Sequence, residues 1–131
     1  IAKNAGGDDH GFRFIQLPYN LHFDQAFMQK NQPVDDKSVS ILDSAKQLNI
    51  GVFTSVPLMQ GKLVDWAKNK PELSEISPSV GLLQFIRSTP GVLAPLVGQK
   101  SDSHVTENLQ VMKIDALSAE NFEKTVKNLT S

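Results

Sequence analysis

The chain has 131 residues, of which 40% are hydrophobic and 21% charged, as is typical of one globular domain or of a piece of one. Its formal net charge of −1 excludes a general attraction to nucleic acid or to an anionic membrane surface. The absence of cysteine excludes disulfides and thiolate chemistry and is compatible with a reducing cytoplasm, where we expect the protein to work. No apolar run approaches the ~20 residues of a transmembrane helix.

The N-terminal half predicts a helix end, a strand, a helix and a second strand. Residues 1–4 resemble the last turn of a helix closed by two glycines, so we expect the chain to be part of a longer one. Residues 12–17 are an apolar run that predicts a buried strand. A long polar loop over 20–34 precedes a helix over 36–48, whose apolar residues recur at helical spacing. Residues 50–54 predict the second strand.

A short helix, a longer helix and a third strand follow. The short helix covers residues 62–68 and is stopped by Pro71. The longer helix starts with Ser77 as its cap and a proline in its first turn, and it ends near Thr89. Residues 92–97 form the third apolar run, which predicts a strand.

Two further helices complete the pattern, over residues 102–111 with Ser101 as cap and over residues 119–129 with Ser118 as cap. Strands that alternate with helices predict an α/β fold with a parallel sheet and right-handed crossovers. The strands are apolar at successive positions, as expected for parallel strands that are buried on both faces.

Three segments, in order along nearly the whole chain, resemble one family. Residues 14–21 read FIQLPYNL, and residues 50–63 read IGVFTSVPLMQGKL. Residues 83–109 run from LQFI through TPGV and VGQKS to ENL. These segments resemble the sixth strand, the seventh strand with its loop, and the seventh helix to eighth helix of aldo/keto reductases. The resemblance implies a partial TIM (β/α)8 barrel, strands six to eight with their helices plus a C-terminal helix, and makes residues 1–131 the C-terminal fragment of one barrel domain.

The resemblance implies an enzyme that reduces aldehydes or ketones with NADPH. The family's catalytic Asp, Tyr, Lys and His lie on the first four strands, so none of them is in this chain, and we expect the isolated chain to be inactive. The cofactor is expected to be NADP(H), with NAD(H) as the alternative. A metal is not expected, because the three histidines lack metal-ligand spacing. The residues expected to bind the cofactor are Gln16, Ser55, Leu58, Gln60, Gly61, Gly98, Lys100, His104, Glu107 and Asn108.

The chemistry of these residues matches a dinucleotide. The Gln16 amide offers a donor and an acceptor to a carboxamide. His104, Glu107 and Asn108 share one face of a helix, and Lys100 adds a positive charge beside its start, where a 2′-phosphate would fit. Amide and carboxylate groups can bind the donor and acceptor edge of adenine. From the residues alone, the alternatives are a glutamine bonded to nearby backbone and a solvated helix face.

The loop over residues 58–61 lies over the pyrophosphate in the family, and Gly61 permits close backbone approach. An ordinary strand-to-helix turn is the alternative. Two positions depart from the family pattern. Ser55 stands where an aromatic residue usually stacks on the nicotinamide, and His104 stands where NADPH-selective members often carry arginine.

Two other functions remain open from the sequence. The first is a cofactor-binding regulatory subunit of the same fold with little or no turnover, which Ser55 would fit. The second is an unrelated small α/β domain with fortuitous motifs. We expect a small-molecule carbonyl substrate in the parent, and neither nucleic acid nor membrane as partner. Three parallel strands leave open edges, so we expect a missing N-terminal barrel half or self-association to cover them.

Overall fold

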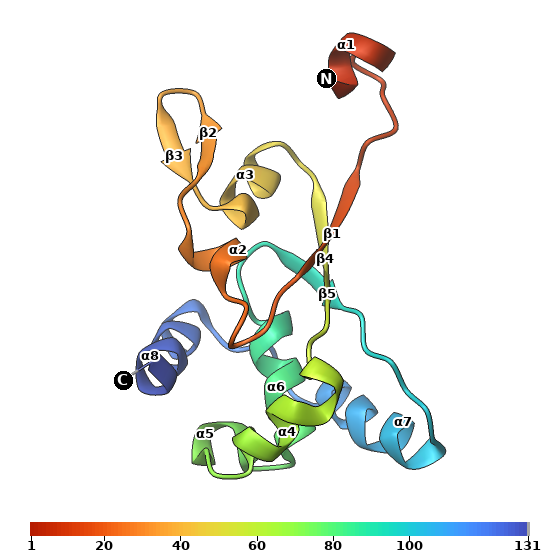
Figure 1. The fold of residues 1–131 in the computed structure, drawn as a ribbon, viewed down its shortest axis with the longest axis vertical. Coiled ribbons are helices and arrows are strands. Elements are labelled where there is room, and N and C mark those ends of the chain that lie inside the picture. The colour runs from red at the N-terminus through yellow and green to blue at the C-terminus, as the bar shows by residue number, and fades with distance from the viewer. Residues whose placement is uncertain (131) are drawn as a thin grey trace.

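The computed structural model describes residues 1–130, and its central element is a sheet of three parallel strands (Figure 1). The strands are β1 (Phe14–Pro18), β4 (Gly51–Ser55) and β5 (Val92–Pro95), in the order β1-β4-β5. Both neighbouring pairs are parallel. Consecutive strand–helix units therefore lie side by side, which is the arrangement found in successive units of a (β/α)8 barrel.

The helices connect these strands and extend beyond them. Their bounds are α1 (Ala2–Gly6), α2 (Gln25–Met28), α3 (Ile41–Gln47), η1 (Met59–Gly61), α4 (Lys62–Ala67), α5 (Pro71–Ser74), α6 (Pro78–Arg87), α7 (Asp102–Asn108), η2 (Leu109–Lys113) and α8 (Ala119–Thr130). The helix end predicted at the N-terminus is α1, which Gly7 closes with a φ of 69°. The helix predicted over 119–129 is α8.

The serine caps predicted for α6 and α7 are confirmed. The Ser77 hydroxyl accepts a hydrogen bond from the Val80 N–H at 3.3 Å, and the Ser101 hydroxyl accepts one from the His104 N–H at 3.3 Å. The helix predicted over 102–111 ends earlier than expected, because the chain tightens into the 3₁₀ turn η2 after Asn108.

The predicted start of the third helix is wrong. Residues 36–48 were expected to be helical, but Lys37–Val39 form strand β3, which pairs with β2 (Gln32–Val34) as an antiparallel hairpin. Asp35 turns the hairpin with a φ of 51°. Helix α3 begins only after Ser40, whose hydroxyl accepts from the Asp43 N–H at 3.1 Å.

Two other predictions of chain course need correction. The segment predicted as a long loop, residues 20–34, contains the short helix α2 and the strand β2. Helix α4 ends near the position predicted from Pro71, but that proline does more than stop a helix. It is the first residue of α5, where its fixed φ is suited to a helix start.

One face of the sheet is covered by helices, and this layer holds the core. Val52 of β4 is completely buried, and it belongs to one apolar cluster with Leu42 of α3 and Leu82 of α6. Phe85 of α6 stacks on Phe122 of α8 at 5.1 Å between ring centroids, so α8 closes the outer side of this layer.

The other face of the sheet is open, contrary to the prediction that the strands are buried on both faces. Phe14 is 59% exposed and Leu93 is 56% exposed. The Phe14 ring packs beside Phe53, with centroids 5.8 Å apart. A side chain at Gly51 would approach the Phe14 ring to 2.7 Å, so glycine is what lets this ring lie over β4. The open face therefore exposes large apolar side chains, Phe14 and Leu93 among them.

Candidate functional site

A cavity of about 590 Å³ lies at the C-terminal ends of β4 and β5. One wall is the loop after β4, residues 56–61, with the start of α4. The other wall is the segment 96–100 after β5, with α7. Its volume is in the range of small-molecule sites, and the carboxyl ends of parallel strands are where α/β proteins bind their ligands.

The structure brings together eight of the ten residues that the sequence predicted for a cofactor site. These residues, which all line this cavity, are Leu58, Gln60, Gly61, Gly98, Lys100, His104, Glu107 and Asn108. They come from two segments about 40 positions apart in the chain, so their convergence is a property of the fold. Gln16 and Ser55 do not line the cavity.

Gln16 and Ser55 belong to the open side of the sheet. Gln16 is an exposed residue of β1 that pairs in register with Phe53. Ser55 is the last residue of β4 and is half-buried beside Pro18. Ser55 precedes Val56, which lines the cavity, but a ligand would have to extend from the cavity onto the open face to reach Ser55 or Gln16.

The loop wall has an unusual backbone. Val56, Met59 and Gln60 have positive φ values of 51°, 46° and 56°, and Gly61 has a φ of 92°. Positive φ is uncommon for residues other than glycine and is least expected for a β-branched residue such as Val56. Each such residue costs about 1–3 kcal/mol and persists where the surroundings fix it, as in ligand-binding loops.

The helix wall is organised around a carboxylate. The Ser79 hydroxyl, from the first turn of α6, donates to Glu107 Oε1 at 2.7 Å. This hydrogen bond, with contributions from Ser77 and from the nearby His104, lowers the pKa of Glu107 although partial burial acts in the opposite direction. Glu107 is therefore ionised at neutral pH and can only accept hydrogen bonds.

Asn108 is a polar residue of α7 that faces the cavity. The residue is 7% exposed and lines the cavity. Its amide atoms are not among the buried side-chain atoms without a hydrogen-bond partner; within the described residues that atom is the Thr54 hydroxyl oxygen, and Thr54 does not line the cavity. The Asn108 amide offers both donors and an acceptor to a group bound in the cavity.

Among the described residues that line the cavity, the one lysine or arginine is Lys100. Asp65 lines the cavity, but its carboxylate is paired with Lys68 at 2.7 Å. Glu107 is held by Ser79. Lys100 is exposed and makes no ion pair within residues 1–130. The arrangement can therefore take an anionic group at Lys100 and a flat polar group at Asn108 and Glu107.

Sequence reasoning missed two residues that support these walls. The role of Ser79 could not be recognised from the sequence, because its partner Glu107 is 28 positions away and no local spacing reveals such a contact. Asn20 is completely buried and donates from Nδ2 to the Val56 carbonyl at 2.9 Å, across 36 positions. The Tyr-Asn pair within the sequence motif was the available signal for Asn20.

The chain's single tyrosine is not placed for chemistry in this cavity. Tyr19 is 1% exposed, does not line the cavity and is hydrogen-bonded to the Thr89 hydroxyl at 3.1 Å. Burial raises the pKa of Tyr19 to about 12, so its hydroxyl holds its proton at neutral pH. We assign Tyr19 to the packing between β1 and α6.

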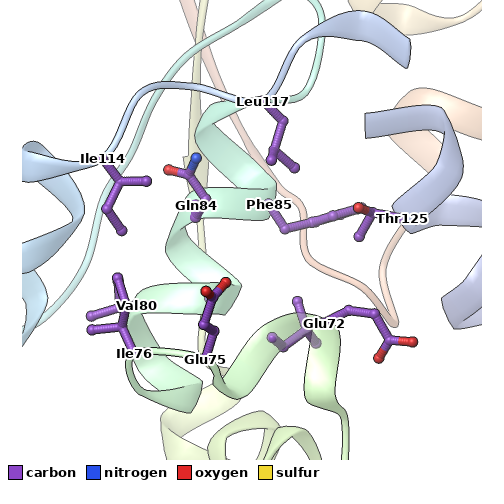
Figure 2. A pocket seen from close by; sticks show the side chains of 11 residues that line it. Glu72, Glu75, Ile76, Val80, Gln84, Phe85, Ile114, Leu117 and Thr125 are labelled. Carbon is purple, nitrogen blue, oxygen red and sulfur yellow. The ribbon is translucent and has the colours of Figure 1, made fainter. Parts of the chain in front are cut away.

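A second, smaller cavity of about 120 Å³ lies between α5, α6 and α8 (Figure 2). Its walls are mostly apolar, from residues such as Val80, Ile114 and Leu117, and the carboxylates of Glu72 and Glu75 stand on the side of α5. None of the predicted site residues lines it.

Within residues 1–130, no group of three or more histidine, aspartate or glutamate side chains is placed to hold a metal ion. No helix in that part of the chain is both long enough and apolar enough to span a membrane.

Comparison with known proteins gives a structural match. No protein-family model and no curated protein matches the sequence. Among solved structures, an aldo-keto reductase from Bacillus halodurans in its holo form is similar, with a TM-score of 0.61 and 16% sequence identity. The fold is that of part of a (β/α)8 barrel and is similar to part of that protein. The match covers 92% of this chain but 43% of that one, so the chain spans less than half the length of its structural relative. The predicted α/β fold class is thereby confirmed.

Proposed function

We propose that this chain forms the cofactor-binding part of an aldo/keto reductase that reduces aldehydes or ketones with NADPH. The observation that carries the proposal is the convergence of Asn108, Glu107 and Lys100 on one cavity at the carboxyl ends of β4 and β5. Asn108 and Glu107 would bind the edge of adenine, and Lys100 would bind the 2′-phosphate. The fold shared with an aldo-keto reductase supports this assignment.

In this proposal the cofactor supplies a hydride to the substrate carbonyl, and the chain's own residues bind and orient it. His104 and Lys100 line the same wall of the cavity, while the loop of Leu58, Gln60 and Gly61 would lie along the pyrophosphate. Because the loop is already fixed in an unusual conformation, little ordering would be needed on binding. No residue of this chain is assigned to proton transfer.

We also propose which part of a barrel domain this chain forms, what covers its open sheet face and in which compartment the protein works. Residues 1–131 would be the C-terminal part of one barrel domain, and further strands would cover the open sheet face around Phe14 and Leu93. The proposed compartment is the cytoplasm, which fits a chain without cysteine.

The test is a titration of the native protein with NADPH and with NADH, followed by nicotinamide fluorescence. Lys100→Ala should weaken NADPH binding by about tenfold and leave NADH binding unchanged, since a charge-assisted contact to the 2′-phosphate is lost. Asn108→Ala should weaken both cofactors. Lys113→Ala is the matched control, because Lys113 is exposed and does not line the cavity. Equal NADPH affinity in Lys100→Ala and the native protein would contradict the proposed clamp.

A second candidate function is a cofactor-binding regulatory subunit with little turnover. It is favoured by Ser55, which offers no aromatic ring for stacking and does not line the cavity. Steady-state assays of the full-length parent with a panel of aldehydes and ketones separate the two candidates. Tight NADPH binding by the parent without NADPH oxidation by any carbonyl would favour the regulatory function.

A further inference from the structure

The loop wall of the cavity needs an external support. Val56 leaves β4 with a φ of 51°, and the backbone stays at positive φ again from Met59 to Gly61. The loop makes its own short hydrogen bonds, from the Met59 N–H to the Val56 carbonyl at 3.2 Å and from the Gly61 N–H to the Leu58 carbonyl at 2.9 Å. Neither bond ties the loop to the rest of the sheet.

Asn20 provides that tie. Its side chain is completely buried at the end of β1, and Nδ2 donates to the Val56 carbonyl at 2.9 Å. Its Oδ1 accepts from the N–H groups of His22 and Phe23 at 2.8 and 2.9 Å, which fixes the amide within its own turn. A rigidly held donor thus meets the carbonyl of the first strained residue of the loop.

We propose that Asn20 is a positioning residue for cofactor binding, which acts through the Val56–Gly61 loop and touches no ligand itself. The inference rests on the proposed function, which places the adenosine 2′-phosphate at the α7 wall and the rest of the dinucleotide along the loop wall. Loss of the Asn20 donor should therefore affect one half of the ligand. The α7 wall is held separately, through Ser79 and Glu107.

The experiment compares two ligands on the native protein and its variants. In the proposed function NADPH engages both walls, whereas adenosine 2′-monophosphate carries the adenine and 2′-phosphate that the α7 wall would bind and has no 5′-phosphate to reach the loop wall. Asn20→Asp keeps an oxygen to accept from His22 and Phe23 but removes the donor to Val56. We expect NADPH to bind about tenfold more weakly and adenosine 2′-monophosphate to bind within about twofold of the native affinity.

Thr89→Val is the matched control. It removes another buried polar contact of the same segment, the hydrogen bond to Tyr19, without touching the loop. It should lower the melting temperature while leaving the ratio of the two affinities unchanged. Native NADPH affinity in Asn20→Asp, or equal weakening of both ligands in a folded variant, would overturn the inference. Failure of the native protein to bind either ligand would overturn the proposed function itself.

A second measurement does not depend on a variant that folds. If the loop is preformed, the N–H groups of Met59 and Gly61 should exchange slowly with deuterium in the ligand-free native protein, because both are hydrogen-bonded inside the anchored loop. Slow exchange supports the anchor, and exchange at the rate of an unstructured peptide would overturn it.

Discussion

The two faces of the sheet differ although the same strands build them. On the covered face, Val52 is 0% exposed and packs among helices, whereas Phe14 and Leu93 on the open face are 59% and 56% exposed. Yet the cavity is formed by the strand ends, by α7 and by the loop after β4, and it does not use the open face. The candidate site therefore depends on the covered layer and on the strand ends, and not on the open face.

The largest expected difference between the faces is in stability. Leu82→Ala on the covered face should lower the free energy of unfolding by about 3 kcal/mol, because the side chain is 1% exposed and its loss leaves a cavity. Leu93→Ala, the same change on the open face, should lower it by less than about 1 kcal/mol. Urea denaturation measures both. Equal losses would show that the open face is buried in solution.

Alkaline pH tests how firmly the covered layer excludes water. Burial raises the pKa of Tyr19 from 10.0 to about 12. The folded state therefore holds this proton more tightly than the unfolded state, and stability is retained below pH 10 and lost as pH rises through about 12. The expected loss is about 2–3 kcal/mol, from about 1.4 kcal/mol per unit. Unfolding at stepped pH, with Tyr19→Phe as control, measures it, and a flat profile would contradict the burial.

A smaller effect is expected where the covered layer meets the cavity. Ser79→Ala removes the main hydrogen bond that lowers the pKa of Glu107, so that pKa should rise and stability at pH 7 should fall by about 1 kcal/mol. Because the folded-state pKa is lowered, this stabilisation exists above the unfolded pKa of 4.5 and disappears as pH falls through the folded value. The variant and the native protein should therefore converge in acid. Ser38→Ala, at an exposed serine of β3, is the control, and its unfolding curve should match that of the native protein.

A substitution on the open face is expected to have the smallest effect on the free energy of unfolding. It is expected to have a large effect on self-association. Leu93→Lys should change the free energy of unfolding by less than about 0.5 kcal/mol, since the side chain is more than half exposed. It should nevertheless reduce self-association of the 131-residue chain, which sedimentation velocity detects. A native chain that is a folded, monodisperse monomer would contradict the proposal that this face is covered.

Local signals predicted the parts of the fold that depend on neighbouring residues. Ser77 before a proline and Ser101 before its helix are caps whose partners lie three residues away, so the sequence locates them directly. The β2–β3 hairpin escaped prediction because Asp35 makes its turn without glycine. The apolar residue Val39 also fits the helical spacing, although Ser40 starts the helix.

The sequence also predicted those site residues that are close together in the chain. Glu107 and Asn108 are adjacent on one helix, so their common face follows from spacing. Their supports do not, because Ser79 reaches Glu107 across 28 positions and Asn20 reaches Val56 across 36. Only a folded chain reveals such contacts. Gln16 was expected at the same site, but it lies on the exposed side of β1. The order of apolar and polar residues along the strand does not predict which side is exposed.

The irregular pairing of β4 with β5 affects how this chain should be aligned with other barrels. Val52 pairs with Val92 but Phe53 pairs with Ala94, so Leu93 is an extra residue that turns onto the open face. In a relative whose strand lacks this residue, a one-position gap must be opened at Leu93. Without that gap, every position from Gly98 to Asn108 would be compared with the wrong neighbour. The α7 wall of the cavity would then be misaligned, whereas the loop wall, which precedes Leu93, would stay in place.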